Sequence, residues 1–401
     1  MRVLFLTHRL PYAPNRGDRV RAYHLLRILS TRTDIDLVSL VHDEEEASHV
    51  GELTALTSSV TALAVSRMRN LARSVLYLPT SRPTTHTLLD APDLDATLAS
   101  LAQKKPDVVL AYCSGMARCA LTPALRSIPM VLDMVDVDSA KWSAMATTHR
   151  GPRSWVYARE ARVLRAFEAA AATHASTTMV VTDKERQTMT AIAPRARVDV
   201  VPNGVDIGRI RPPSEPTGAP IVVFCGVMDY APNVEGVLWF ARTVWPLVTT
   251  ARPDARFDIV GSNPVPAIRA LHDMAGVTVV GGVPDVAPYL WRAAVSVAPL
   301  LTARGVQNKV LEAIGAGLPT VVTPVVAEGL PSLVLPACTA AATPEEFAAA
   351  VLKYLHKTPA ARRALALSVD LNALSWDRTV ASVYEILGDA AGRSARLGAN
   401  S

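Results

Sequence analysis

The stretch ARGVQNKVLEAIGAGLP, residues 303–319, decides the fold because it connects two apolar runs, at 295–300 and 320–326. A glycine turn opens this stretch and one short helix follows, so the three segments together predict a βαβ unit of a parallel sheet. Unpaired backbone N–H groups and the positive end of the helix dipole favour an anion at the start of such a helix. The stretch therefore predicts a diphosphate site.

Two charged side chains in this helix support that interpretation. Lys309 is a point charge that suits phosphate, and Glu312, one turn further on the same face, is able to accept hydrogen bonds from sugar hydroxyls. A phosphate contact and a hydroxyl contact one turn apart are what a nucleoside diphosphate requires. The alternative is a solvated ion pair between Lys309 and Glu312 on a surface helix, which contributes little to stability.

Length and composition exclude several classes of protein. A chain of 401 residues, half of them hydrophobic and 19% charged, is expected to form two globular domains. The net charge of +5 fits anionic substrates or an anionic membrane surface, but no basic stripe suits nucleic acid, so we expect no nucleic-acid partner. The four cysteines lack metal-ligand spacing, and the first apolar run is too short for a signal peptide or a membrane span. We expect a cytoplasmic protein with reduced thiols.

Short apolar runs alternate with longer helical stretches along the whole chain, which predicts an α/β fold of two Rossmann-like domains. We place the first domain at 1–205, the second at 206–370, and a helix that crosses back to the first domain, with the tail, at 371–401. Ligands of open α/β sheets bind outside the carboxyl ends of the strands, so both domains are expected to face a central cleft. The expected strands are 3–7, 35–41, 108–111, 130–134, 179–182, 198–201, 221–226, 256–260, 277–280, 295–300 and 320–326, and a helix is expected at 233–249.

Four segments carry a resemblance to a known family. They are PYAPNRGDRVR at 11–21, VPNGVD at 201–206, FCGVMDYAPN at 224–233 and QNKVLEA at 307–313. Over nearly its whole length the chain resembles the family 4 glycosyltransferases, which have the two-domain GT-B fold. Within that group it is similar to the sugar transferases found with PEP-CTERM/exosortase exopolysaccharide systems.

The resemblance implies a retaining glycosyltransferase of surface polysaccharide biosynthesis that needs no metal and no cofactor. Its donor is expected to be a UDP- or GDP-linked sugar, and its acceptor a saccharide or a lipid-linked saccharide. Lys309 is expected to pair with the departing diphosphate and Glu312 to hold the ribose hydroxyls. The residues expected to bind the donor are Gly17, Gly226, Arg304, Gly305, Val306, Lys309 and Glu312.

Two positions depart from the family pattern. Arg304 stands where the family often has a glutamate that contacts the donor sugar, so we interpret it as a contact for a phosphate or a sugar carboxylate. The strand at 130–134 is followed by Asp136 and Asp138 rather than by a histidine. Either aspartate is a candidate to orient the acceptor hydroxyl. Together with Asp133 they also suit a divalent cation, but aspartates are common in turns and helix caps, so we predict no metal.

Two alternative functions remain open at this stage. A nucleotide-sugar epimerase or a non-catalytic nucleotide-sugar-binding subunit would use the same donor site. A dehydrogenase is disfavoured because no Gly-x-Gly-x-x-Gly follows the first strand of either domain. Basic residues beside apolar and aromatic ones, such as Arg67, Arg69, Met68 and Trp155, suit a peripheral contact with the inner face of the plasma membrane, although a merely solvated basic helix face is the commoner case.

Overall fold

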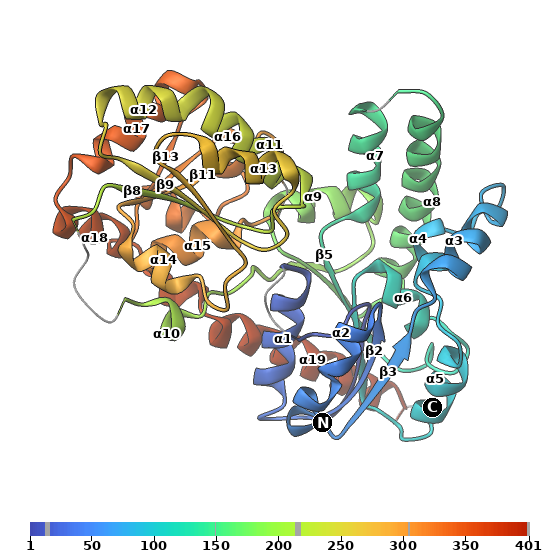
Figure 1. Ribbon diagram of the computed structural model, residues 1–401. Coiled ribbons are helices and arrows are strands. Elements are labelled where there is room, and N and C mark those ends of the chain that lie inside the picture. The colour runs from blue at the N-terminus through green and yellow to red at the C-terminus, as the bar shows by residue number, and fades with distance from the viewer. Residues whose placement is uncertain (13–16, 149, 213–217, 304, 399–401) are drawn as a thin grey trace. The chain divides into compact units, whose positions relative to one another are not determined.

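The computed structural model (Figure 1) describes residues 1–12, 17–148, 150–212, 218–303 and 305–398. The chain divides into two compact units. The first unit contains residues 1–202 and 379–401, and the second contains 203–378. Each unit is built around one fully parallel sheet covered by helices, which confirms the predicted α/β fold with two Rossmann-like domains.

The first unit contains a seven-stranded sheet in the order β3-β2-β1-β4-β5-β6-β7. Its strands are β1 Arg2–Thr7, β2 Asp34–Val41, β3 Ser59–Ala64, β4 Val108–Tyr112, β5 Met130–Val135, β6 Thr177–Val180 and β7 Val198–Val200. Its helices are α1 Gly17–Leu29, α2 Glu44–Ser48, α3 Arg67–Leu76, α4 Thr84–Leu88, α5 Leu94–Ala102, α6 Ser114–Ala120, α7 Asp138–Thr148, α8 Pro152–His174, α9 Asp183–Ile192 and most of α19 Trp376–Gly398, with a 3-10 helix at Val50–Leu56.

Alternation along β1 explains why this sheet is covered on both faces. Val3 and Phe5 belong to the core shared with α1 and α19, whereas Leu4 and Leu6 belong to the core shared with α5, α6 and α9. Successive side chains of a strand point to opposite faces, so a continuous apolar run requires helices on both sides. The C-terminal helix α19 contributes Leu387 to the first of these cores.

The second unit contains a six-stranded sheet in the order β10-β9-β8-β11-β12-β13. Its strands are β8 Ile221–Cys225, β9 Arg256–Val260, β10 Val277–Gly281, β11 Val295–Ala298, β12 Thr320–Val322 and β13 Cys338–Ala340. Its helices are α10 Ile207–Ile210, α11 Ala231–Trp239, α12 Trp245–Ala251, α13 Pro266–Arg269, α14 Ala287–Arg292, α15 Asn308–Gly315, α16 Pro324–Ala327, α17 Pro344–Leu355 and α18 Pro359–Leu367. A π-helical segment, Phe240–Val244, joins α11 to α12, and 3-10 helices lie at Ala270–Asp273, Ser332–Ala337 and Leu371–Leu374.

Several expected elements differ from the observed ones. The strand expected at 320–326 ends at Val322, because Pro324 opens the short helix α16, where a proline fits the first turn. The strand expected at 295–300 ends at Ala298, and the one at 179–182 is shifted to Thr177–Val180. The edge strands β3 and β13 were not predicted, because little of either strand is buried and their apolar pattern is correspondingly weak.

Both sheets have a point at which the strand order reverses, between β1 and β4 in the first unit and between β8 and β11 in the second. The connections that leave two such strands run to opposite faces of the sheet, which opens a crevice at their carboxyl ends. Among the helices that the structure describes, we find none with the length and apolarity that crossing a membrane requires.

Candidate functional site

The second unit has its candidate site at the carboxyl ends of β8 and β11. These strands pair in parallel, with Val222 opposite Val295. Gly226 follows β8, and the loop after β11 leads into α15, so the pairing brings the start of α15 towards Gly226. The two segments that the sequence singled out, at 224–233 and 307–313, therefore meet at one edge of one sheet.

Lys309 lies at the centre of this site. Its Nζ donates a hydrogen bond to Asn233 Oδ1 at 2.6 Å and lies 4.5 Å from the centre of the Phe224 ring. Burial lowers the pKa of Lys309 to about 8, although the nearby Cys225 and Glu312 act in the opposite direction. Lys309 is thus a partly buried ammonium held by an amide oxygen and a ring face. Within the described residues it forms no ion pair with Glu312.

Gly226 leaves room for this arrangement. A Cβ atom at residue 226 would lie 2.8 Å from Asn233 Nδ2 and 3.1 Å from Lys309 Nζ, closer than side-chain carbons approach such atoms. Asn233 Nδ2 donates to Val227 O at 2.9 Å, which fixes the amide with its oxygen towards Lys309. Sequence reasoning missed Asn233 as a site residue. Its signal in the sequence was its place at the end of the 224–233 segment, in the first turn of the helix after the second domain's first strand.

The loop before α15 contains the two residues expected to offer backbone N–H groups. Gly305 has a φ of +60°, a conformation that glycine adopts without strain. The loop also passes close to Gly329, where a Cβ would lie 2.7 Å from Gly305 O. Val306 is buried in the core of the second unit. Arg304 lies outside the described residues.

Glu312 lies one turn after Lys309 on α15. Burial raises its pKa, while the positive charges of Arg209 and Lys309 lower it. Its side chain is partly buried and forms no hydrogen bond with the residues the structure describes. A carboxylate in this state has acceptor capacity to spare for a ligand's hydroxyl groups.

A second polar cluster lies at the carboxyl end of β5 in the first unit. Val135 has a φ of +63°, an unfavourable conformation for a β-branched residue, and the turn after it is held by two buried carboxylates. Glu185 Oε2 accepts from Val137 N at 2.8 Å, and Glu168 Oε1 accepts from Ser139 N at 3.1 Å. Burial raises the pKa of Glu168 to about 7.

Asp136 and Asp138 are brought together in this cluster by a lysine that sequence reasoning missed. Lys141 Nζ lies 3.1 Å from Asp136 Oδ2 and 3.3 Å from Asp138 Oδ1, and Ser114 Oγ donates to Asp138 Oδ2 at 2.7 Å. Asp136 Oδ1 is buried and has no hydrogen-bond partner among the described residues. Asp133 does not join its neighbours, because it accepts from Arg21 Nε at 2.8 Å inside the core.

The remaining predicted residue, Gly17, is the first residue of α1. The structure therefore gathers Gly226, Lys309, Glu312 and the 305–306 loop in the second unit, and Asp136 with Asp138 in the first. Within the described residues, no three His, Cys, Asp or Glu side chains are arranged to hold a metal ion.

Two family models match the chain. The model described as a glycosyl transferase 4-like domain matches residues 16–204, and that of the glycosyl transferases group 1 matches residues 219–357. No curated protein matches the chain in sequence.

Several solved structures share its fold. Alr3699/HepE from Anabaena, in complex with UDP and glucose, is 13% identical with a TM-score of 0.67 and covers 97% of this chain and 100% of its own. TarM from S. aureus is 9% identical with a TM-score of 0.66, covering 96% and 98%. A structure described as trehalose-6-phosphate from E. coli bound with UDP-2-fluoro glucose is 11% identical with a TM-score of 0.64, covering 96% and 99%. At these identities the likeness shows the fold alone.

The buried ammonium of Lys309 is expected to cost the folded chain stability. Its pKa falls from 10.5 to about 8 on folding, so the unfolded chain binds this proton more tightly, and stability from this group increases as the pH rises from about 8 to about 10.5. At pH 7, Lys309→Met removes the cost of the buried charge but also removes the hydrogen bond to Asn233. The net effect is expected to be an increase of roughly 1 kcal/mol in the free energy of unfolding of the second unit. Urea denaturation measures this change.

The matched control is Lys357→Met, which removes an exposed lysine of the same unit. This variant is expected to leave the free energy of unfolding unchanged. A destabilised Lys309→Met variant would contradict the cost that we assign to the buried ammonium.

Proposed function

We propose that this chain, a glycosyltransferase of the GT-B type, binds a UDP- or GDP-linked sugar in its second unit and transfers the sugar with retention of configuration. The acceptor in this proposal is a saccharide, free or lipid-linked, of surface polysaccharide biosynthesis, as in the PEP-CTERM/exosortase systems that the sequence resembles. One observation carries the donor site: the Lys309 ammonium at the β8/β11 switch point, beside a glycine and the start of a helix.

Stabilisation of the leaving nucleoside diphosphate is the main task of this site. Negative charge grows on the β-phosphate as the bond to the sugar breaks, and groups already oriented towards that charge lower the barrier. Lys309 supplies a full charge, and the N–H groups at the start of α15, with those of Gly305 and Val306, supply the dipole. A bound diphosphate also compensates for the burial of the ammonium, so it is expected to raise the pKa of Lys309 above its ligand-free value.

The two ends of the donor have different candidate partners. Glu312 is placed one turn from Lys309, which suits the ribose hydroxyls when the diphosphate lies at Lys309. Arg304 is our candidate for a phosphate or a sugar carboxylate, which would favour an acidic donor sugar. UDP is the nucleotide named with the structural relatives from Anabaena and E. coli, which supports UDP over GDP as the first donor to test.

Asp136 is the stronger candidate of the two aspartates for the acceptor. Asp138 already accepts from Ser114 and Lys141, whereas Asp136 keeps one buried oxygen, Oδ1, without a partner in the described part of the chain. A buried carboxylate oxygen with an unused lone pair is costly, and a substrate hydroxyl is the kind of donor that satisfies it. We therefore assign Asp136 to the orientation of the acceptor hydroxyl, with Lys141 holding the carboxylate in place.

We also propose a cytoplasmic location. It is supported by the four cysteines, all of which are free thiols in the structure. Burial raises the pKa of Cys113 and Cys225 to about 12, which keeps them protonated and unreactive at neutral pH.

The Glu312→Gln variant tests whether Glu312 contacts the nucleoside part of the donor and not the diphosphate. The variant is expected to weaken UDP binding about tenfold, because the amide replaces one of two acceptor oxygens, and to leave the affinity for inorganic pyrophosphate unchanged. Lys309→Met is expected to weaken both ligands. Isothermal titration calorimetry of each variant measures these affinities, with Glu345→Gln, an exposed glutamate, as the control. Equal losses for UDP and pyrophosphate in Glu312→Gln would contradict the ribose assignment.

Asp136→Asn tests the acceptor role. The variant is expected to lose about a hundredfold in kcat for transfer while its affinity for UDP stays at the wild-type value, since the altered group lies in the first unit. Asp138→Asn is the comparison, and its loss is expected to be smaller. Wild-type kinetics in Asp136→Asn would remove this residue from the reaction.

Two assays of the wild-type chain distinguish the transferase from the other two candidate functions. Donor incubated without acceptor yields an epimer if the chain is a nucleotide-sugar epimerase. UDP binding with no turnover of any donor would instead indicate a non-catalytic binding subunit.

A further inference from the structure

Helix α3 presents its apolar side chains to solvent. Met68 is 85% exposed, Leu76 74%, Val75 58% and Leu71 56%. At about 100° per residue these four side chains, with Ala72 between them, form one stripe about 140° wide along the helix. Single exposed apolar residues are ordinary, but a continuous stripe on one helix marks a surface for another molecule.

The inward face of α3 is polar, the reverse of a normal surface helix. Asn70 and Ser74 are the buried residues of α3. Asn70 Nδ2 donates to Leu88 O at 3.3 Å and to Asp90 O at 2.6 Å. These two hydrogen bonds fix which face of α3 points inward, so the apolar stripe on the opposite face is held towards solvent.

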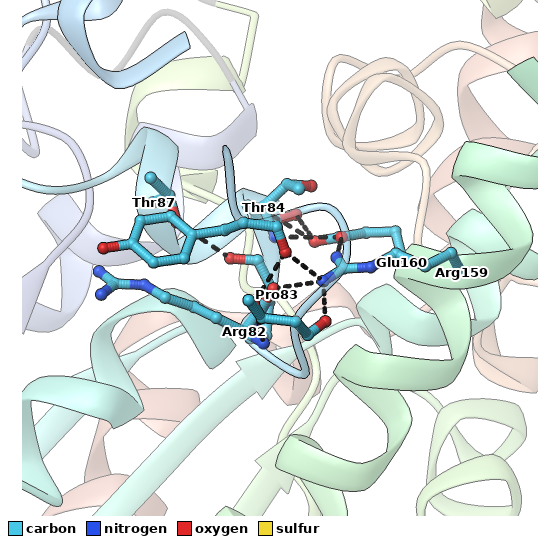
Figure 2. Close-up of polar contacts among 9 residues, drawn as sticks. Arg82, Pro83, Thr84, Thr87, Arg159 and Glu160 are labelled. Carbon is cyan, nitrogen blue, oxygen red and sulfur yellow. Dashed lines mark hydrogen bonds and ion pairs between the residues drawn. The ribbon is translucent and has the colours of Figure 1, made fainter. Parts of the chain in front are cut away.

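A buried ion pair on α8 fixes the segment that follows α3, as Figure 2 shows. Arg159 Nη2 donates to the backbone oxygens of Tyr77 at 3.0 Å and of Arg82 at 2.7 Å. Its neighbour Glu160 accepts from the backbone N of Thr84 at 3.1 Å. Arg159 and Glu160 also pair with each other at 2.8 Å, with both side chains almost fully buried. The end of α3 is thus tied to α8, on which Trp155, one turn before Arg159, is 61% exposed.

The exposed charged residues of α3 are arginines, and Arg73, which is partly buried, pairs with Asp90 at 3.4 Å. Arg67 and Arg69 are exposed on α3 and flank the apolar side chains on opposite sides, and neither forms an ion pair within the described residues. Helix α8 exposes three more arginines, whereas its two glutamates, Glu160 and Glu168, are buried. The exposed arginines of α8 are Arg153, Arg162 and Arg165.

We propose that α3 docks this chain on the surface of an anionic phospholipid bilayer. The apolar stripe would enter the boundary between headgroups and acyl chains, and Arg67 and Arg69 would reach the lipid phosphates on either side. The surface of a single helix face is small compared with the roughly 800 Å² that each partner of a stable protein dimer buries. Binding at a bilayer surface needs less apolar area, because the negative charge of the lipid surface also attracts the arginines. The inference goes beyond the transfer reaction and does not depend on it.

Co-sedimentation of the full chain with vesicles tests the proposal. Binding is expected to mixed phosphatidylcholine–phosphatidylglycerol vesicles, to be weak with phosphatidylcholine alone, and to fall as salt is added. The triple variant Met68→Ser, Leu71→Ser, Leu76→Ser and the double variant Arg67→Gln, Arg69→Gln are each expected to bind at least tenfold more weakly. All the altered side chains are exposed, so both variants are expected to keep the wild-type melting temperature and UDP affinity.

Matched controls alter the same residue types elsewhere. Leu367→Ser removes an exposed leucine of the second unit, and Arg126→Gln with Arg195→Gln removes two exposed arginines outside α3 and α8. These variants are expected to bind as the wild type does.

Three results would overturn the proposal. The first is no sedimentation of the chain with anionic vesicles, and the second is wild-type binding by the triple serine variant. The third is a wild-type dimer in sedimentation velocity that is absent from the triple variant, which would mean that a second copy of the chain covers the stripe. UDP affinity is measured on the same variants as vesicle binding. The docking proposal and the donor-site proposal are therefore tested separately.

Discussion

The parallel pairing of β8 with β11 is the constraint on which the proposed donor site depends. The two strands are adjacent in the sheet although β9 and β10 separate them in sequence, and the order of the sheet reverses between them. This pairing places Lys309 against Phe224 and Asn233. An ammonium in that position is less stable than one in water, as its lowered pKa shows. An anionic ligand is the natural partner for such a charge, which is why we propose a diphosphate at this position.

Sequence predicted the parts of this account that depend on local pattern. Strands buried on both faces are continuous apolar runs, so most of β1–β12 were found, and the turn at Gly305 between two such runs indicated the helix that contains Lys309. Asn233 was missed, because its role arises from a contact with a residue 76 positions away. The pairing of Lys141 with Asp136 and Asp138 was missed for a different reason, since an aspartate-rich turn does not reveal which cation neutralises it.

Helix α3 shows a limit of a different kind. Its sequence contains both an apolar stripe and a polar stripe, and helical periodicity normally places the apolar one inward. Only the structure shows that Asn70 faces inward, fixed by the carbonyl groups of Leu88 and Asp90, and that Arg159 of α8 holds the segment that follows α3. Tertiary hydrogen bonds here override the usual preference, and this reversal is the observation on which the proposed docking surface rests.

The most direct test of the central claim is a crystal structure of the chain with a bound nucleoside diphosphate. The account predicts the β-phosphate within hydrogen-bonding distance of Lys309 Nζ and of the N–H groups at 305–306, with the ribose at Glu312. A diphosphate bound away from the carboxyl ends of β8 and β11, with Lys309 making no contact to it, would contradict the account.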